Sequence, residues 1–303
     1  MLTFLPPFVL GLLAFGLFVA NTIFWAIPLY VLAFFKFLVP AEGWRAFWTK
    51  GLTALAESWA HMNDVGLSLT QRIRWDIRGV EGLARRDSYF VSCNHRSWVD
   101  IVVLQKIFNR RIPFPRFFLK RSLAFVPLLG GAWWALDFPF MRRYSAAYLA
   151  RHPEKRGKDL ETTRKACARF ANRPVTILNF LEGTRFTRAK HDAQGSPYRY
   201  LLKPKAGGMA FALGSMGGRV KALLDVTIVY PKEKVSLWDL LSGRLRRVIV
   251  HVERHEIPEE FRREGYLDDE HLRERFQAWV RDLWARKDDL IDRLRMESGL
   301  AMA

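Results

Sequence analysis

Residues 88–100 read SYFVSCNHRSWVD, in which an apolar strand runs into a polar turn and then into the first residues of a helix. The turn is expected at Asn94 and His95, and the helix from about Trp98. On one continuous helix, His95 and Asp100 would lie about 140° apart and would not meet. With His95 in the turn and Asp100 in the first helical turn, the carboxylate can reach back to the imidazole.

Such a pair is typical of a general base. A carboxylate bound to one ring nitrogen fixes the tautomer of the histidine and stabilises the imidazolium, and the other nitrogen can then take up a proton. The alternative is a capping histidine followed by an ordinary acidic residue, which the helix dipole favours. Cys93 also permits a Cys/His nucleophile, although a buried cysteine in a strand fits the pattern better.

Further strands and helices are expected on the C-terminal side of this stretch. The apolar runs PVTILNFL (174–181) and ALLDVTIVY (222–230) indicate buried strands, and residues 247–257 alternate as a strand. Residues 145–172 and 267–296 have helical patterns, and KPKAGGMAFALGSMGG indicates a loop that opens a helix of small residues. Strands that alternate with helices predict an α/β domain.

The composition indicates anionic partners. The 303-residue chain has 48 Lys and Arg against 30 Asp and Glu, a formal net charge of +18. This excess is typical of proteins that meet nucleic acid, an acidic membrane surface or phosphorylated substrates. The 11 Trp and 23 Phe favour the membrane interface. The two cysteines, Cys93 and Cys167, exclude a scaffold held by disulfides.

The N-terminal segment predicts a membrane anchor. Residues 1–35 contain no charged side chain. As a straight helix they would be about 52 Å long, whereas the hydrocarbon core of a bilayer is roughly 30 Å thick. Pro28 offers a break, so residues 1–40 are expected to form a kinked helix or a helical hairpin.

The segments after the anchor are basic and aromatic. Lys36 and Arg45 place the C-terminal bulk on the cytoplasmic side by the positive-inside tendency. Residues 41–74 predict an amphipathic helix, which fits an interfacial position and a core-packing position equally well. Residues 101–136 contain no acidic residue and interleave cations with aromatic rings, which fits an anionic lipid surface.

Two further motifs are candidates for phosphate binding. The sequence FLEGTR (180–185) follows a buried strand; Gly183 would allow backbone amides to approach a ligand, and Arg185 provides a planar fork for phosphate. Its spacing is not that of a P-loop. Arg142 and Arg143 follow an apolar stretch, where they would hold a phosphate or extend toward the membrane surface.

His251, Glu253 and His255 would share one face of a strand. Such a group could bind a metal ion, or it could be the solvated face of the strand. It lacks the H-E-x-x-H order of the common zinc sites, so the solvated face is favoured.

Taken in order, these segments resemble the lysophosphatidic acid acyltransferase (1-acyl-sn-glycerol-3-phosphate O-acyltransferase) family of glycerophospholipid acyltransferases. The first block of that family, N-H-x-x-x-x-D, is met by Asn94, His95 and Asp100. The second is a K-x-x-L…P…G run that ends in F-x-x-R. The sequence KRSLAFVPLLGGAWWALDFPFMRR is similar to it and places the arginine at Arg143.

The remaining blocks lie farther along the chain. E-G-T-R is met by residues 182–185, and the fourth block, an apolar strand that ends in proline, is similar to VTIVYP with Pro231. KPKAGG, which contains Lys205, resembles the basic glycine-containing loop of the family. Leu181 replaces a proline and Asp137 a glycine, as in the branch that includes eukaryotic endoplasmic-reticulum and some bacterial acyltransferases.

The resemblance implies an α/β glycerolipid acyltransferase domain, with a central mixed β-sheet flanked by helices, joined to an N-terminal membrane-inserted helical element. The expected organisation is a membrane anchor at 1–40, an interfacial amphipathic helix at 41–74, the acyltransferase domain at 75–258 and a C-terminal amphipathic helix at 259–303. The expected location is a membrane, with the active site on the cytoplasmic face; a bacterial inner membrane fits better than the endoplasmic reticulum.

The implied reaction moves an acyl group from a thioester to the sn-2 hydroxyl of lysophosphatidic acid, which gives phosphatidic acid. The co-substrate is acyl-CoA or acyl carrier protein, no cofactor or metal is expected, and the partners are an anionic bilayer and these substrates but not nucleic acid. The implied roles are a catalytic pair, a substrate site and supporting residues: His95 and Asp100; Arg143, Glu182, Gly183, Thr184 and Arg185; and Asn94, Lys205 and Pro231.

Two alternatives remain at this point. The first is an acyltransferase for another lysophospholipid or for a lipid A acceptor, which would use the same chemistry. The second is a non-catalytic basic membrane protein that binds anionic lipid, against which the intact His95 and Asp100 argue. No helix-turn-helix or zinc-finger spacing supports a nucleic-acid partner.

Overall fold

The computed structural model describes residues 2, 4–141, 151, 173–216, 218–262 and 269–300. Three features considered above lie outside these residues, namely Arg143 with its neighbour Arg142, Cys167, and the helix expected at 145–172.

A six-stranded mixed sheet forms the centre of the molecule, in the order β1-β8-β7-β2-β6-β3. Strands β7, β2, β6 and β3 are mutually parallel, whereas β8 is antiparallel to β7 and parallel to the edge strand β1. The expected mixed sheet is therefore confirmed. The bounds are Arg74–Arg78 (β1), Tyr89–Cys93 (β2), Pro115–Phe117 (β3), Thr176–Phe180 (β6), Ala222–Val229 (β7) and Arg247–Glu256 (β8).

The central strands follow from their sequences. Every residue of β2 and of β7 is buried, as expected for parallel strands that are covered by helices on both faces. Their continuous apolar runs lie where the sequence predicts strands, and β6 begins two residues inside the predicted segment. Two short strands, β4 (Leu119–Lys120) and β5 (Phe140–Met141), pair separately.

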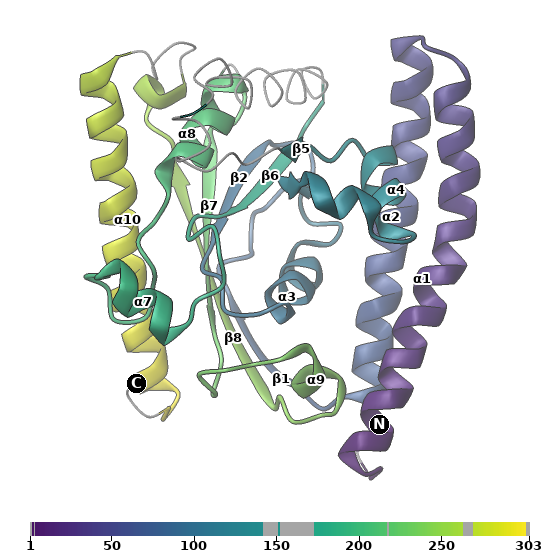
Figure 1. Cartoon of the computed structure of the whole chain (residues 1–303), viewed down its shortest axis with the longest axis horizontal. Helices are drawn as coiled ribbons and strands as arrows, with labels where there is room; N and C mark the ends of the chain where they lie inside the picture. Colours follow the sequence, from purple (N-terminus) through teal and green to yellow (C-terminus); the bar gives the residue numbers. More distant parts are fainter. Residues whose placement is uncertain are drawn as a thin grey trace.

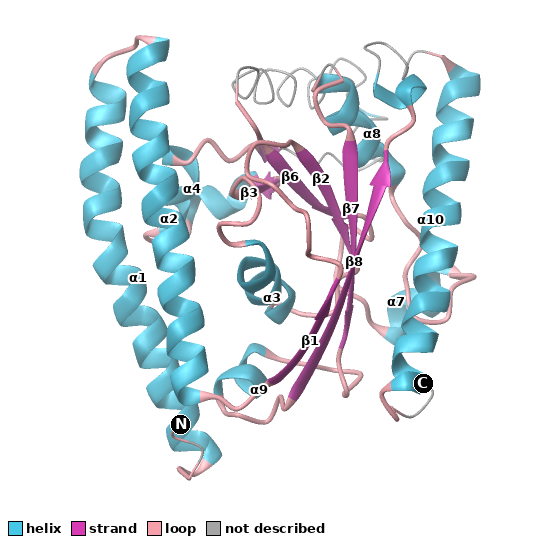
Figure 2. Ribbon diagram, turned by 180° about the vertical axis from the view of Figure 1, so that it is seen from behind, coloured by secondary structure: helices cyan, strands magenta, loops and turns pink. Residues whose placement is uncertain are grey.

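Helices cover both faces of the sheet (Figure 1 and Figure 2). On one face, α3 (Val99–Phe108) and α9 (Leu237–Leu241) pack over a core that includes Val91 and Leu224. On the other, α8 (Ala206–Ser215) and α10 (Glu270–Glu297) pack over a core that includes Phe90 and Trp284. The remaining short helices are η1 (Arg121–Phe125), α4 (Leu129–Ala135), α7 (Arg188–Gln194) and η3 (Glu259–Arg262).

The N-terminal segment forms one long helix, α1 (Pro7–Leu38), which pairs with α2 (Glu42–Thr70) on the side of the molecule away from α10 (Figure 1). The hairpin considered within residues 1–40 is therefore wrong, because α1 continues through Pro28. A proline inside a helix removes one backbone hydrogen bond. Contacts along the length of α1 keep the helix continuous in spite of that loss. Among the described helices, α1 alone is long and apolar enough to cross a membrane.

The first half of α1 contacts α9 and α2. Near its start, the ring of Phe8 lies 6.0 Å from that of Trp238 on α9. A side chain at Gly11 would come within 2.7 Å of the same tryptophan, so this close approach requires glycine. In the middle, the Asn21 amide donates hydrogen bonds of 2.8 Å to Asn63 Oδ1 and of 3.1 Å to the Trp59 carbonyl. This partly buried polar contact helps to set the register of α1 against α2.

The end of α1 contacts the segment that precedes β5. The Tyr30 hydroxyl donates a 2.6 Å hydrogen bond to the Leu128 carbonyl, and Lys36 Nζ donates one of 2.6 Å to the Ala135 carbonyl. The Lys36 side chain is only 2% exposed and forms a 2.9 Å ion pair with Asp137. A buried ion pair therefore joins the apolar helix to the rest of the protein.

Asp137 is the residue that replaces the glycine expected from the resemblance. Its φ of 62° lies in the left-handed region, which explains why glycine suits this position. Such a conformation costs roughly 1–3 kcal/mol for a residue with a side chain. The carboxylate offsets that cost, because it binds Lys36 and also accepts a 3.2 Å hydrogen bond from Arg173.

Candidate active site

The candidate active site lies where three neighbouring parallel strands end. His95 follows β2, Glu182 follows β6 and Tyr230 follows β7, and these strands lie side by side in the order β7-β2-β6. Ligands commonly bind at the carboxyl ends of parallel strands, because the loops that leave the strands converge there. The register of the sheet thus brings together residues that are distant in the sequence, with His95 87 positions from Glu182.

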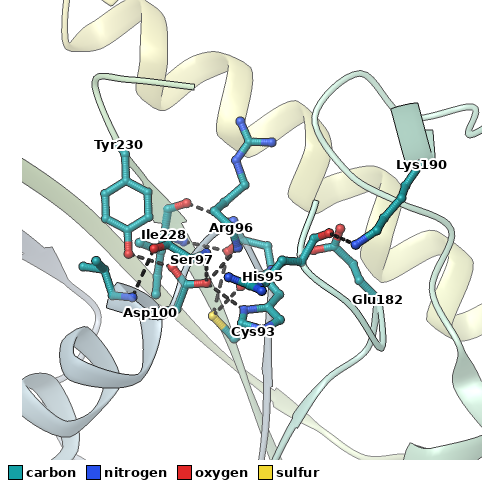
Figure 3. Close-up of polar contacts among 12 residues, drawn as sticks. Cys93, His95, Arg96, Ser97, Asp100, Glu182, Lys190, Ile228 and Tyr230 are labelled. Atoms are coloured by element: carbon teal, nitrogen blue, oxygen red, sulfur yellow. Dashed lines mark hydrogen bonds and ion pairs between the residues drawn. The ribbon is translucent and has the colours of Figure 1, made fainter. Parts of the chain in front are cut away.

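The contact expected between His95 and Asp100 is formed. His95 Nδ1 lies 2.9 Å from Asp100 Oδ2, and Asp100 is completely buried in the first turn of α3 (Figure 3). The same oxygen accepts the backbone N–H groups of Arg96 at 2.7 Å and Ser97 at 2.9 Å. The other oxygen accepts the hydroxyl of Tyr230 at 2.7 Å. These four donors hold the carboxylate in one orientation.

The imidazole of His95 faces the site with its other nitrogen. Its ring stacks on Phe180, the last residue of β6, with centroids 3.9 Å apart and planes 17° from parallel. Nε2 has no hydrogen-bond partner among the described residues, and the side chain is 16% exposed. With the Nδ1 proton directed at Asp100, Nε2 carries the lone pair and can accept a proton from a bound hydroxyl group.

Glu182 holds the turn that carries His95. Its Oε1 accepts the backbone N–H of His95 at 2.7 Å, and its Oε2 accepts that of Leu202 at 3.0 Å. Glu182 is fully buried, and burial raises the pKa of its carboxyl to about 7 even though the two N–H donors favour the carboxylate. The resemblance implies that Glu182 helps to shape the substrate site, and in the structure both of its oxygens contact the protein backbone.

Asn94 joins two strand ends. Its side-chain amide donates to the Ile228 carbonyl at 2.9 Å and accepts the Ile228 N–H at 2.8 Å, so β2 and β7 stay paired beyond the end of β2. The preceding residue, Cys93, is completely buried and directs its thiol at the Asn94 carbonyl. Burial raises the pKa of this thiol well above its usual value, which disfavours the thiolate that a Cys/His nucleophile would require.

Three cationic side chains lie on or beside the loop that follows Glu182. Gly183 adopts a φ of +69°, and a Cβ there would lie 3.2 Å from the side chain of Lys205. Thr184 accepts a 2.7 Å hydrogen bond from Lys190, and the Arg185 guanidinium lies 5.5 Å from the centre of the Trp98 ring. Arg185, Lys190 and Lys205 are all exposed. Sequence reasoning missed Lys190, although the Thr187 cap that positions its helix is a recognisable signal.

Two features considered in the sequence make no polar contact with the His95–Asp100 pair. Pro231 follows Tyr230 directly, but among the described residues it has no polar contact with the pair. His251, Glu253 and His255 lie on β8, with 3.3 Å between His255 Nε2 and a Glu253 oxygen. The part of the chain that the structure describes contains no group of three His, Cys, Asp or Glu side chains arranged to hold a metal ion.

A family model described as Acyltransferase matches residues 74–230, just over half of the chain. The chain belongs to the Acyltransferase family. That match contains His95, Asp100 and the E-G-T-R sequence, so the resemblance noted from these blocks is confirmed at the level of the family.

Curated 1-acyl-sn-glycerol-3-phosphate acyltransferases are similar to this chain. The 1-acyl-sn-glycerol-3-phosphate acyltransferase 2 of Brassica oleracea is 28% identical over 225 residues, which cover 69% of this chain and 52% of that protein. The 1-acyl-sn-glycerol-3-phosphate acyltransferase gamma of Homo sapiens is 30% identical over 183 residues, 56% of this chain and 43% of that protein. The chain thus spans about half the length of the curated relatives it matches.

A solved acyltransferase structure also aligns with this one. The 1-acyl-sn-glycerophosphate (LPA) acyltransferase PlsC from Thermotoga maritima gives a TM-score of 0.49 at 16% sequence identity. The alignment covers 91% of this chain and 94% of that chain.

Proposed function

We propose that this member of the Acyltransferase family transfers an acyl group from an acyl thioester to the sn-2 hydroxyl of lysophosphatidic acid. The observation that carries the proposal is the 2.9 Å contact between His95 and the buried Asp100, which leaves Nε2 exposed to the site. The names of the relatives from Brassica oleracea and Homo sapiens support this acceptor. The product would be phosphatidic acid.

The chemistry follows from the two ring nitrogens. Nε2 of His95 takes the proton of the acceptor hydroxyl while the oxygen attacks the thioester carbonyl, and Asp100 stabilises the imidazolium that forms. When the tetrahedral intermediate collapses, the carbon–sulfur bond breaks and the imidazolium returns the proton to the leaving thiolate. The thioester is already activated, so this sequence of steps needs only a base and donors for the developing oxyanion.

The phosphate of the acceptor would bind the cations beside the pair. Arg185, Lys190 and Lys205 are exposed; Arg185 follows Gly183 on its loop, Lys190 lies on α7 and Lys205 precedes α8. The resemblance adds Arg143 to this set. Glu182 acts in this scheme as a positioning residue, because both of its oxygens bind backbone N–H groups.

An assay of thiol release tests the proposal. The purified full-length chain is mixed with acyl-CoA or acyl carrier protein thioester and with lysophosphatidate, and free thiol and phosphatidate are both measured. Release of thiol that requires both substrates is expected. Activity only with lysophosphatidylcholine, lysophosphatidylethanolamine or a lipid A precursor would move the acceptor to that class. Binding of anionic lipid without thiol release would make the chain a non-catalytic binding protein.

Arg185→Ala is expected to raise the KM for lysophosphatidate roughly ten- to hundredfold and to leave the KM for the acyl donor unchanged. A charge-assisted hydrogen bond to phosphate contributes about 1.5–3 kcal/mol, which corresponds to that range. Arg185→Lys should recover only part of the loss, because an ammonium group cannot reproduce the bidentate fork. Steady-state kinetics in both substrates measure the effect.

The matched control is Arg188→Ala, because Arg188 is exposed three residues later at the start of α7 and, among the described residues, its one ion pair is a 3.8 Å contact with Asp192. It should leave both KM values within about twofold of the wild type, since exposed pairs contribute little. If Arg185→Ala instead raised only the KM for acyl-CoA, Arg185 would belong to the site for the donor's phosphates.

The contacts of α1 support a location along the surface of a membrane. α1 touches α9 near its first residues and the segment 128–137 near its last, so a helix upright in a bilayer would draw the part of the protein that joins these contacts across the hydrocarbon. Phe24, Ile27, Val31 and Phe34 are at least half exposed and share one stripe of the helix. We place this stripe in one leaflet, with the active site on the cytoplasmic side.

Extraction measures the strength of this attachment. The full-length chain should stay with membranes in about 1 M salt, which screens surface charges, and should require detergent for release. The variant Ile27→Glu/Phe34→Glu should be released by salt, because two carboxylates then interrupt the apolar stripe. If salt alone extracts the unmodified protein, the stripe is not in the lipid.

A further inference from the structure

The two oxygens of the Asp100 carboxylate have different partners. Oδ2 binds His95 Nδ1 and accepts the backbone N–H groups of Arg96 and Ser97. Oδ1 accepts the hydroxyl of Tyr230 at 2.7 Å, its one hydrogen bond among the described residues (Figure 3). The Tyr230 side chain thus binds the oxygen that does not face the histidine.

The position of Tyr230 is set by the sheet. β7 runs parallel to β2, with Cys93 opposite Val226, and the paired hydrogen bonds between Asn94 and Ile228 extend this pairing to the turn that carries His95. Tyr230 lies two residues beyond Ile228 and is only 3% exposed. A phenol in this place is therefore held against Asp100 by the backbone of two strands.

We propose that Tyr230 is a positioning residue for the His95–Asp100 pair. Its hydroxyl keeps the carboxylate turned so that Oδ2 faces Nδ1, and it draws part of the negative charge toward Oδ1. The inference rests on the proposed role of His95 as the base. The resemblance gives a supporting role at this strand end to Pro231, whereas the residue that contacts Asp100 is its neighbour Tyr230.

Two physical arguments support this role. A carboxylate bound through both oxygens cannot turn about its Cβ–Cγ bond, so the oxygen that meets Nδ1 stays in place for each proton transfer. A donor on Oδ1 also stabilises the anion and so weakens its attraction for an imidazolium. Burial, with the adjacent charge of Asp100, raises the pKa of Tyr230 well above its usual value, so the hydroxyl keeps its proton.

Other charged or titratable groups also face the pair, and a change confined to the Tyr230 hydroxyl leaves all of them in place. A shift in pH response that follows from the loss of this hydroxyl can therefore be assigned to Asp100. These groups are Glu182 after β6, Cys93 and Arg96 beside His95, Arg185 on the following loop, and the Lys287–Asp225 pair behind β7.

Tyr230→Phe should lower kcat roughly three- to thirtyfold and leave the KM of both substrates within about twofold of the wild type, since one hydrogen bond to a charged group is lost away from the substrates. The acidic limb of the kcat/KM profile should move to higher pH, because a carboxylate without its second donor holds the proton on His95 more firmly. A purely structural role would change the unfolding temperature and leave this limb in place.

Tyr89→Phe is the matched control. Tyr89 is also buried and donates a 3.2 Å hydrogen bond to a carboxylate, that of Asp87, but it lies at the opposite end of β2 from His95. Its loss removes a phenol–carboxylate contact from the same sheet without touching Asp100. The pH profile and kcat should both stay at their wild-type values.

A second measurement separates this inference from the proposed function. Carbethoxylation of His95, followed by mass spectrometry across a pH range without substrate, reports the protonation of the imidazole even if the acceptor is not lysophosphatidate. The midpoint should rise in Tyr230→Phe and should fall when 3-fluorotyrosine, a stronger donor, replaces Tyr230. If both variants keep the wild-type midpoint within about 0.2 pH units, Tyr230 does not position the pair.

Discussion

His95→Ala is expected to lower the turnover of acyl transfer by about 10²–10⁴-fold, the usual contribution of a general base. The reason is geometric, because Nε2 of His95 faces the site while Nδ1 is bound to Asp100 at 2.9 Å. Asp100→Asn should also lose much of the rate, but less than His95→Ala, since the base remains while its orientation and its charge partner are impaired. Thiol release at saturating substrate measures both effects.

His271→Ala serves as the control, because His271 is exposed on the first turn of α10. It should keep wild-type turnover and wild-type unfolding behaviour. Retention by His95→Ala of more than about a tenth of the wild-type rate would contradict the assignment of the base. Such a result would leave His95 as a residue of the turn and would favour the role of a non-catalytic lipid-binding protein.

Asp137→Asn is expected to lower the free energy of unfolding by about 3–5 kcal/mol, the usual cost of removing one partner of a buried ion pair. Lys36 is 2% exposed, so its charge would stay buried without its carboxylate. Asparagine adopts the left-handed conformation of this position readily, so the loss would arise from the charge and not from the backbone. Urea unfolding of the detergent-solubilised protein measures the change.

The double variant Lys36→Met/Asp137→Asn tests the cause. Removing both charges should be less damaging than removing the carboxylate alone, because no uncompensated lysine remains. An equal or greater loss in the double variant would show that Asp137 acts through its other contacts, which include the 3.2 Å hydrogen bond from Arg173.

The sequence predicts the central strands and the contact between His95 and Asp100 well, for local reasons. Buried parallel strands have continuous apolar runs, so β2 and β7 lie where those runs lie. The contact between His95 and Asp100 depends only on a turn and on the first turn of the following helix, both of which belong to one short stretch.

The rest of the site depends on strands that are distant in the sequence. Glu182 and Tyr230 reach the pair because β6 and β7 flank β2 in one register, which no local pattern reveals. The continuity of α1 also depends on residues that are distant in the sequence. Pro28 predicts a break, whereas contacts with distant helices keep α1 continuous. The resemblance shows that Asp137 replaces a glycine. The sequence does not show why, because the carboxylate pairs with Lys36, which lies about 100 residues earlier.

The distance between α1 and its contacts has a consequence for biosynthesis. Tyr30 and Leu128 are 98 residues apart, and Lys36 and Ala135 are 99 residues apart. At the usual rate of translation, about 5–20 residues per second, the ribosome needs roughly 5–20 s to supply these partners. During this interval α2 can already pair with the nascent helix, but the segments that cover the end of α1 have not yet been made. The proposed lipid contact would therefore form first, and the catalytic domain would complete its folding against a helix that is already in place.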